Sequence, residues 1–185
     1  MYYPALKANV DFFLKPMYLD INEDLRLMPF SNPNKEVQAY FENSSTNEIK
    51  KEIPGAYVET FENAIERIPK LINSFIMKQH FLYNIVLVDY SLIIGHIMLE
   101  TPLSQNPIKE WNINFWINND WANRGIVTIA VRRLLKYLYT MQISKLYAFV
   151  SFENQASKRV LAKTGFKQIS KKDTNGNELY SYEFD

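Results

Sequence analysis

Apolar residues recur at helical spacing in three segments of this chain. They lie three and four positions apart, which places them on one face of a helix. The segments that this pattern predicts to be helical are 60–79, 125–141 and 154–164. Asn154 is placed to cap the last of these helices, and Gly165 is placed to end it.

Two shorter helices are predicted ahead of these from their start signals. Asn32 followed by Pro33 puts a capping side chain next to a proline at the first helical position, and the helix should run to about Phe41. Ser45 and Glu48 have the spacing of a capping box, which predicts another short helical turn.

Alternating or continuous apolar runs predict the strands. The predicted strands are 24–30, 82–88, 92–100, 111–118, 145–152, 166–170 and 178–184. The strand–helix–strand order of the second half leaves room for one parallel pair. We therefore expect an α+β fold, in which helices flank one mixed and mostly antiparallel central sheet.

Composition and charge exclude several classes of protein. The formal net charge of +1 gives no global field to attract a nucleic acid or an anionic membrane. The absence of cysteine excludes disulfides, thiolate metal sites and cysteine nucleophiles. His96 is expected to be buried and hydrogen-bonded, and neither it nor His80 is interpreted as a metal ligand. With no secretion signal and no long apolar run, we expect a cytoplasmic location and no membrane partner.

The length of 185 residues fits one domain with a modest appendage. Residues 1–20 are rich in aromatic side chains and are interpreted as an N-terminal extension that packs on a single domain over residues 21–185. Three roles stay open for this extension. It could cover the edge of the sheet, close a substrate site or join a homodimer.

The segment from Trp116 to Val131 is the most informative for chemistry, because a strand leads through a polar turn into an amphipathic helix. The first N–H groups of a helix have no internal partner and lie at its positive end, so they can bind an anion. Gly125 allows close approach, Arg124 adds charge and Thr128 adds a hydroxyl. A plain turn with a solvated basic face is the alternative.

Two other features point to a polar site. Asn154 and Ser157 fall at the N-cap and third position of one helix, so both side chains should lie near its start. The strand 111–118 has one face of apolar side chains, whereas the other carries Asn112, Asn114, Trp116 and Asn118. Because unpaired amides are costly to bury, we interpret the Asn face as the lining of a polar cleft. Hydrogen-bonded amides on an exposed sheet surface are the alternative.

Together these segments resemble the GNAT N-acetyltransferase superfamily, and most closely its Rim-type branch of ribosomal-protein N-terminal acetyltransferases. The resemblance covers the chain from about residue 24 onward. It rests on Ile94-Gly95, Phe115-Trp116-Ile117, Asn123 to Thr128, Asn154 with Ser157, and Val160-Leu161 ahead of Gly165-Phe166. It implies the GNAT acyl-CoA N-acyltransferase fold, with the sheet splayed between the fourth and fifth predicted strands.

The resemblance also implies a cofactor site for acetyl-CoA, whose pyrophosphate the family binds through backbone N–H groups. The residues to which it carries over are Ile117, Ala122, Asn123, Arg124, Gly125, Ile126, Val127, Thr128 and Asn154. The family carries Gln or Arg at the place of Ala122, and Gly or Ala at the place of Val127. Val127 keeps its N–H group, but a tighter fit is expected there.

The implied reaction is direct transfer of an acetyl group from acetyl-CoA to a primary amine, in a ternary complex. The acceptor is a protein N-terminal α-amine or a small-molecule amine, and it should enter over the Asn-bearing strand, beside helix 60–79 and the loop before it. An acyl-CoA-binding protein with weak or no catalysis is the alternative.

Three residues are candidates for catalysis. Ser157 is expected to hydrogen-bond or protonate the leaving thiolate. Asn112 stands where relatives often carry a glutamate that could act as a general base, and Glu100 is the best remaining acid. The missing carboxylate favours an amine of low pKa, because such an amine needs less help to lose its proton.

Overall fold

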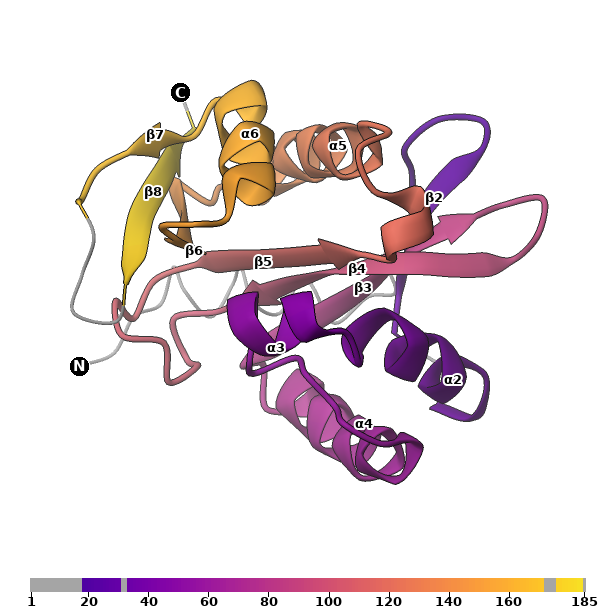
Figure 1. The fold of residues 1–185 in the computed structure, drawn as a ribbon. Coiled ribbons are helices and arrows are strands. Elements are labelled where there is room, and N and C mark those ends of the chain that lie inside the picture. The colour runs from indigo at the N-terminus through magenta and orange to yellow at the C-terminus, as the bar shows by residue number, and fades with distance from the viewer. Residues whose placement is uncertain (1–17, 31–32, 172–175, 185) are drawn as a thin grey trace.

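An eight-stranded sheet forms the centre of the computed structural model, which describes residues 18–30, 33–171 and 176–184. The strand order is β1-β2-β3-β4-β5-β6-β8-β7, and all neighbours are antiparallel except β5 and β6 (Figure 1). The strands are β1 (Leu19–Asp20), β2 (Leu25–Pro29), β3 (His80–Leu87), β4 (Leu92–Glu100), β5 (Asn112–Ile117), β6 (Lys145–Ser151), β7 (Lys167–Gln168) and β8 (Asn177–Glu183). The predicted mixed, mostly antiparallel sheet is confirmed.

Helices cover both faces of this sheet, as Figure 1 shows. One face carries α2 (Pro33–Ser44), α3 (Asn47–Glu52) and α4 (Phe61–Ile76), and the other carries α5 (Ile126–Thr140) and α6 (Gln155–Thr164). A single 3-10 turn, η1 (Asn119–Trp121), lies between β5 and α5. No helix within the described residues is both long enough and apolar enough to span a bilayer.

Alternation along the strands divides the buried residues into two cores. Ile97 and Leu99 of β4 belong to a large cluster with the apolar face of α5. Met98 lies between them and faces a smaller cluster, which contains Ile68 and Leu71 of α4. Because successive side chains of a strand point to opposite faces, one apolar run serves both cores.

The helix α2 continues to Ser44, beyond the predicted end at Phe41. Tertiary contacts explain the extra turn. Asn43 and Ser44 are buried, and their side chains are bound to the sheet: Asn43 Nδ2 lies 3.3 Å from His96 Nε2, and Trp116 Nε1 donates to Ser44 Oγ at 3.1 Å. The predicted cap, Asn32, lies outside the described residues.

Capping contacts begin the two helices that follow. The prediction of Ser45 as the cap of α3 is wrong by one residue, because Thr46 Oγ1 accepts the hydrogen bond from Ile49 N at 3.3 Å. The start of α4 is a reciprocal pair, in which Thr60 Oγ1 accepts from Asn63 N and Asn63 Oδ1 accepts from Thr60 N. The predicted helix at 60–79 is confirmed and is shorter at its C-terminal end.

The structure refines three expectations about segments near the two ends of the chain. Gly165 ends α6 with a φ of 95°, a left-handed conformation that suits glycine. The predicted strand 166–170 is reduced to Lys167–Gln168. Of the predicted N-terminal extension, residues 1–17 lie outside the described residues, and Leu19–Asp20 pairs with β2 at the edge of the sheet.

The parallel neighbours β5 and β6 separate soon after they meet. Their ladder has one register pair, Asn112 with Tyr147, where Tyr147 N donates to the Trp111 carbonyl at 2.8 Å. On its other edge β5 is paired with β4 along its whole length, and the bonding continues to Asn118 N and the Ile94 carbonyl. Alternation from that bond directs the N–H groups of Phe115 and Ile117 toward β6. The predicted splay is thus confirmed.

A chain of buried polar side chains lies beneath α2. Asn84 Nδ2 donates to Glu36 Oε1 at 2.6 Å, and Asn84 Oδ1 lies 3.0 Å from His96 Nδ1. Because Oδ1 only accepts, Nδ1 carries the hydrogen, and Nε2 then accepts from Asn43. His96 is fully buried and burial lowers its pKa to about 3, so the ring is neutral. The predicted buried, hydrogen-bonded histidine is confirmed.

Candidate functional site

A cavity of about 620 Å³ opens where β5 separates from β6. Its walls are α3, the end of β5 with the loop that follows, and the N-terminal turns of α5 and α6. These elements are far apart in the sequence, and the splay brings them together. The cavity thus reaches both faces of the sheet past the open edge of β5.

The N-terminus of α5 presents unpaired N–H groups to this cavity. Gly125 precedes the helix with a φ of 77°, which glycine adopts without strain, and it makes no side-chain capping bond. The first internal bond runs from Ile129 N to the Gly125 carbonyl at 3.1 Å. The N–H groups of Ile126, Val127 and Thr128 therefore have no partner within the helix. All three residues line the cavity, at the positive end of the helix.

The loop before α5 is held by its own polar contacts. Asn118 Oδ1 accepts from Asp120 N at 3.0 Å, which caps η1. Arg124 Nη2 donates to the Asp120 carbonyl at 2.8 Å, and its guanidinium lies 4.7 Å from the Trp121 ring centroid. Asn123 has a φ of 60°, a left-handed conformation that asparagine tolerates. The charge of Arg124 is thereby fixed at the cavity wall.

Val127 has most of its side chain in the core rather than in the cavity. Its side chain is 8% exposed and belongs to the large apolar cluster with Ala130 and Val131. Where the family pattern has Gly or Ala, this chain therefore accommodates a branched side chain by burying it. Its N–H group remains at the cavity wall.

A second cavity, of about 20 Å³, lies between the separating strands. This volume is close to that of one water molecule. The residues that line both cavities are Glu52, Ile53, Phe115, Asn154 and Ser157. The two cavities are therefore neighbours. We call the region that these five residues border the passage; it lies between α3 on one face of the sheet and the start of α6 on the other.

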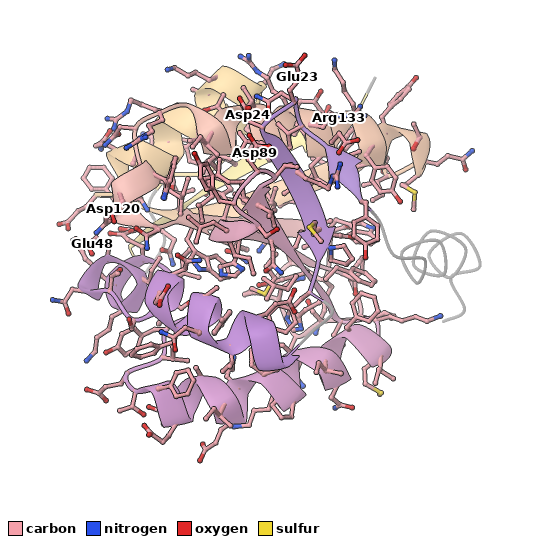
Figure 2. The ribbon with its side chains drawn as sticks, turned by 90° about the vertical axis from the view of Figure 1, so that its right-hand side faces the viewer. Glu23, Asp24, Glu48, Asp89, Asp120 and Arg133 are labelled. Carbon is pink, nitrogen blue, oxygen red and sulfur yellow. The ribbon has the colours of Figure 1, made fainter. Side chains whose placement is uncertain are left out.

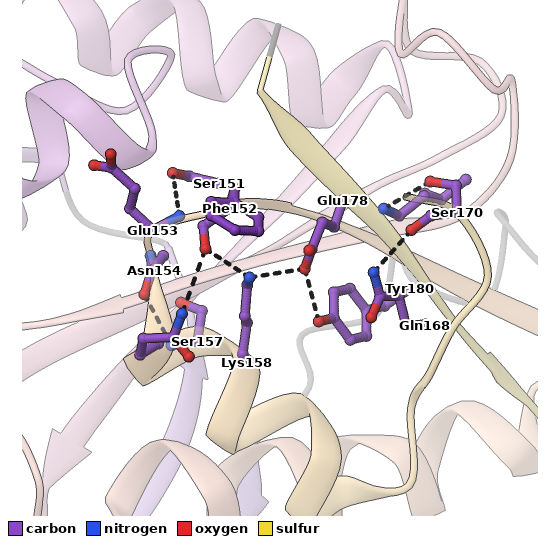
Figure 3. Close-up of polar contacts among 12 residues, drawn as sticks. Ser151, Phe152, Glu153, Asn154, Ser157, Lys158, Gln168, Ser170, Glu178 and Tyr180 are labelled. Atoms are coloured by element: carbon purple, nitrogen blue, oxygen red, sulfur yellow. Dashed lines mark hydrogen bonds and ion pairs between the residues drawn. The ribbon is translucent and has the colours of Figure 1, made fainter. Parts of the chain in front are cut away.

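The start of α6 is fixed at this passage. Asn154 Oδ1 accepts from Ser157 N at 2.9 Å, which caps the helix as predicted and places both side chains at the first turn. Figure 3 shows the two residues beside Lys158. The cap and the passage thus share the same two residues.

An ion pair anchors this turn to the sheet. Lys158 Nζ lies 2.8 Å from Glu178 Oε2 on β8 and donates to the Phe152 carbonyl at 2.6 Å (Figure 3). Both side chains of the pair are largely buried, and the hydrogen bond from Lys158 lowers the pKa of Glu178. Tyr180 also donates to Glu178 Oε2, at 3.0 Å, so this oxygen has two partners. These contacts hold Ser157 in position.

The structure gathers most of the residues that the sequence singled out. The following all line the larger cavity: Ile117, Ala122, Asn123, Arg124, Gly125, Ile126, Val127, Thr128, Asn154 and Ser157. Asn112 and Glu100 line neither cavity. Residues of the segments 116–131 and 152–166 therefore face one space, although the rest of α5 and the strand β6 lie between the two segments in the chain.

The interpretation of the Asn face as the lining of a cleft holds only in part. Asn114 lines the smaller cavity and Trp116 the larger one. Asn112 is 3% exposed, and its Oδ1 atom has no hydrogen-bond partner within the described residues. Asn118 instead caps η1. The alternation along β5 thus predicted correctly which side chains share a face. Other parts of the chain decide which of these side chains line a cavity.

Glu100 is held away from the cavities by the amides of the same strand pair. Asn114 Nδ2 donates to Glu100 Oε1 at 2.8 Å. Burial raises the pKa of Glu100, while hydrogen bonds from Asn112 and Asn114 oppose this change. The candidate acid Glu100 therefore lies on β4, along the edge of β5 that faces away from the splay.

Glu52 is the residue of the passage that sequence reasoning missed. It is the last residue of α3 and lies one helical turn after Glu48. A spacing of four residues puts the two carboxylates on one face of the helix, which was a signal in the sequence. Figure 2 shows Glu48 at the edge of the molecule, and Glu48 lines only the larger cavity. Helix 60–79, which was expected to shape the acceptor pocket together with the loop before it, lines neither of these cavities, whereas α3 and Ile53 of that loop line both.

Comparison with known proteins gives a family match over most of the chain. Residues 21–167 match the family model described as an acetyltransferase (GNAT) domain. No curated protein sequence matches the chain.

Solved structures share the fold at low sequence identity. A GNAT-family acetyltransferase from Bacillus anthracis is 22% identical with a TM-score of 0.73, covering 90% of this chain and 98% of that one. The acetyltransferase that modifies the N-terminal serine of ribosomal protein L7/L12 from Salmonella typhimurium is 16% identical with a TM-score of 0.75, covering 91% and 100%. AAC(6')-Ib in complex with ribostamycin and coenzyme A is 18% identical with a TM-score of 0.69, covering 86% and 92%.

Proposed function

Because the chain belongs to the GNAT acetyltransferase family, we propose that it transfers an acetyl group from acetyl-CoA directly to a primary amine. The acceptor is a protein N-terminal α-amine or a small-molecule amine, and both substrates are bound at the same time. One observation carries this proposal: the cavity that borders the N–H groups at the start of α5 adjoins a second cavity in the splay between β5 and β6.

The residues around the cavity fit the donor. The N–H groups of Ile126, Val127 and Thr128 suit a pyrophosphate, because they lie at the positive end of a fifteen-residue helix. Arg124 adds a positive charge beside them. Ile117 and Asn154 also line this cavity. Acetyl-CoA supplies an acetyl group activated as a thioester, and the passage is where the acetyl group would meet the amine.

The residues of the passage have separate tasks in this proposal. The N–H group of Phe115, which β5 directs toward the splay, can stabilise negative charge on the thioester oxygen. The Ser157 hydroxyl can give a proton to the leaving sulfur. Direct transfer agrees with the composition, since the chain has no cysteine to carry the acetyl group.

Acetyl-CoA is expected to raise the melting temperature of the wild-type protein, and Arg124→Glu is expected to remove most of that increase. A ligand that binds only the folded state stabilises it by about 2.7 kcal/mol at one hundred times its Kd. The measurement is thermal unfolding with and without acetyl-CoA. Lys136→Glu is the matched control, because it makes the same charge change on an exposed face of α5 outside the cavity. Absence of a shift at millimolar acetyl-CoA would contradict the donor site.

Ser157→Ala is expected to lower turnover by roughly a hundredfold, the lower limit for a positioned general acid. The helix cap should survive, because Asn154 accepts from the backbone N–H of residue 157 rather than from its hydroxyl. Acetyl-CoA should therefore still stabilise the variant as it does the wild type. Thiol release is the measurement, and equal turnover in the two proteins would rule out this role.

Acetyl transfer to an acceptor is tested with two amines chosen from the structural relatives. The test amines are a short peptide with a free N-terminal serine, the group that one structural relative modifies, and ribostamycin, which is bound in the structure of another. Thiol release with either one supports acetyl transfer. Stabilisation by acetyl-CoA without release toward both amines favours the alternative, a CoA-binding protein with little or no catalysis.

A further inference from the structure

Buried side-chain atoms without a hydrogen-bond partner are rare in native proteins and point to missing ligands or strain. Three such atoms occur within the described residues: Glu52 Oε2, Arg67 Nε and Asn112 Oδ1. Of these residues, Glu52 alone lines the two neighbouring cavities of the candidate site. The unpartnered carboxylate oxygen therefore lies in the part of the molecule where the reaction is proposed.

The two oxygens of Glu52 have different surroundings. Oε1 lies 3.9 Å from Lys51 Nζ, an ammonium that is also bound to the carboxylate of Glu153. Oε2 has no hydrogen-bond partner, and the side chain as a whole is 15% exposed. A carboxylate oxygen accepts hydrogen bonds and attracts cations, so a donor with positive charge would fit it.

Glu52 also lies on the correct side of the sheet for an acceptor. Asn154 and Ser157 border the shared passage from the start of α6, and α6 lies on the same face of the sheet as α5, which carries the proposed donor site. Glu52 and Ile53 border the same passage from α3, on the opposite face. An amine that approached the acetyl group from the face of α3 would therefore meet Glu52.

Other acids fit this place less well. Glu100 lines neither cavity and accepts a hydrogen bond from Asn114. Glu48 is exposed and lines only the larger cavity. Glu153 is ion-paired with Lys51 and also lines only the larger cavity. Within the described residues, Glu52 is the one acid that borders the passage.

We propose that Glu52 Oε2 binds the ammonium group of the acceptor and takes a proton from it, an inference that rests on the proposed acetyl transfer. The proton moves from nitrogen to Oε2, and the freed lone pair forms the C–N bond while the C–S bond breaks. The nitrogen then gives up a second proton, and the leaving thiolate takes one up. The products are an amide, a thiol and one proton, which Glu52 releases to solvent.

This assignment names a substrate class. The bound amine is a cation, so amines of ordinary high pKa are substrates and not only those of low pKa. The expectation from Asn112 thus changes, because a carboxylate from α3 takes the place of the one that β5 lacks.

The test compares Glu52→Gln with wild type in two measurements on the full chain. Calorimetric titration of ribostamycin and of the N-terminal-serine peptide, without acetyl-CoA, measures ammonium binding. We expect roughly tenfold weaker binding of the better acceptor, as for loss of one hydrogen bond to a charged group. We expect its acetylation to fall by roughly a hundredfold or more. Stabilisation by acetyl-CoA should be unchanged.

Three controls separate this role from a general effect. Hydroxylamine is largely unprotonated at neutral pH, so its acetylation should stay close to the wild-type rate in Glu52→Gln. Glu62→Gln removes an exposed charge of α4 that lines neither cavity, and this variant should bind and acetylate the amine normally. Glu52→Asp keeps a carboxylate and should recover part of the lost activity.

The remaining outcomes overturn the inference. Wild-type binding and rates in Glu52→Gln would do so directly. Equal losses in Glu52→Gln and Glu62→Gln would show that the loss of any negative charge on this face of the sheet has the same effect. A wild-type protein that binds acetyl-CoA but acetylates neither amine nor hydroxylamine would contradict the proposed function itself, and this inference with it.

Discussion

Replacing Gly95 with alanine is expected to destabilise the protein by about 3 kcal/mol and to lower its melting temperature by roughly 10 °C. A Cβ atom at this position would lie 2.5 Å from the carbonyl oxygen of Trp116 and 2.9 Å from the Cα of Ile117. Both are backbone atoms, so no side-chain rotation relieves the overlap. The strand β5 would have to move away from β4. Urea unfolding of the two proteins measures the loss.

The same change should also weaken the donor site. Trp116 and Ile117 line the larger cavity, so a displaced β5 alters its wall, and we expect less stabilisation by acetyl-CoA. Gly55→Ala is the matched control, because nothing lies within 4 Å of a Cβ atom there and its φ is ordinary. That variant should be as stable as wild type or slightly more stable. Equal stability of the two alanine variants would contradict the close approach of β4 and β5.

Acidification from pH 7.5 to pH 5 is expected to cost the folded state about 2 kcal/mol through His96 alone. Burial lowers the pKa of His96 to about 3, whereas an unfolded histidine titrates near 6.5. Between these values the unfolded chain binds a proton that the folded protein does not. The free energy of unfolding therefore falls as pH falls through the unfolded pKa, and it keeps falling until pH approaches 3.

His96→Gln isolates this contribution. A glutamine amide can donate to Asn84 Oδ1 and accept from Asn43 Nδ2, as the neutral ring does, but it does not titrate. The variant loses the ring contacts with Tyr40 and Trp116, so its stability at pH 7.5 should be lower. Its loss between pH 7.5 and pH 5 should be smaller than that of wild type.

Urea unfolding at both pH values measures the two losses. Burial and the charge of Arg67 also lower the pKa of His80, which contributes equally to both proteins and cancels in the comparison. Parallel losses in wild type and variant would mean that His96 accepts a proton in the folded state.

Local interactions explain what the sequence alone determined. Asn154 caps α6 through a bond to Ser157, Gly165 ends that helix, and Gly125 precedes α5, as their positions predict. These contacts join residues at most a few positions apart, so their geometry is fixed once the chain is locally helical. The alternation along β5 is equally local, and it correctly separates Ile113 from Trp116. The helix N-terminus that faces the cavity was therefore predictable in detail.

Only the tertiary structure decided which of these groups meet. Asn112 and Asn114 share a face, yet Asn112 is buried with an unpartnered oxygen, whereas Asn114 borders the passage. Glu52 of α3 borders the passage together with Ser157, although the two residues are far apart in the sequence. No local pattern in the sequence predicts that they lie close together. Burial, hydrogen-bond partners and the opening between β5 and β6 depend on how distant segments pack. The sequence therefore determines the elements and the donor loop, whereas the acceptor side arises from the packing of α3 against the splayed sheet.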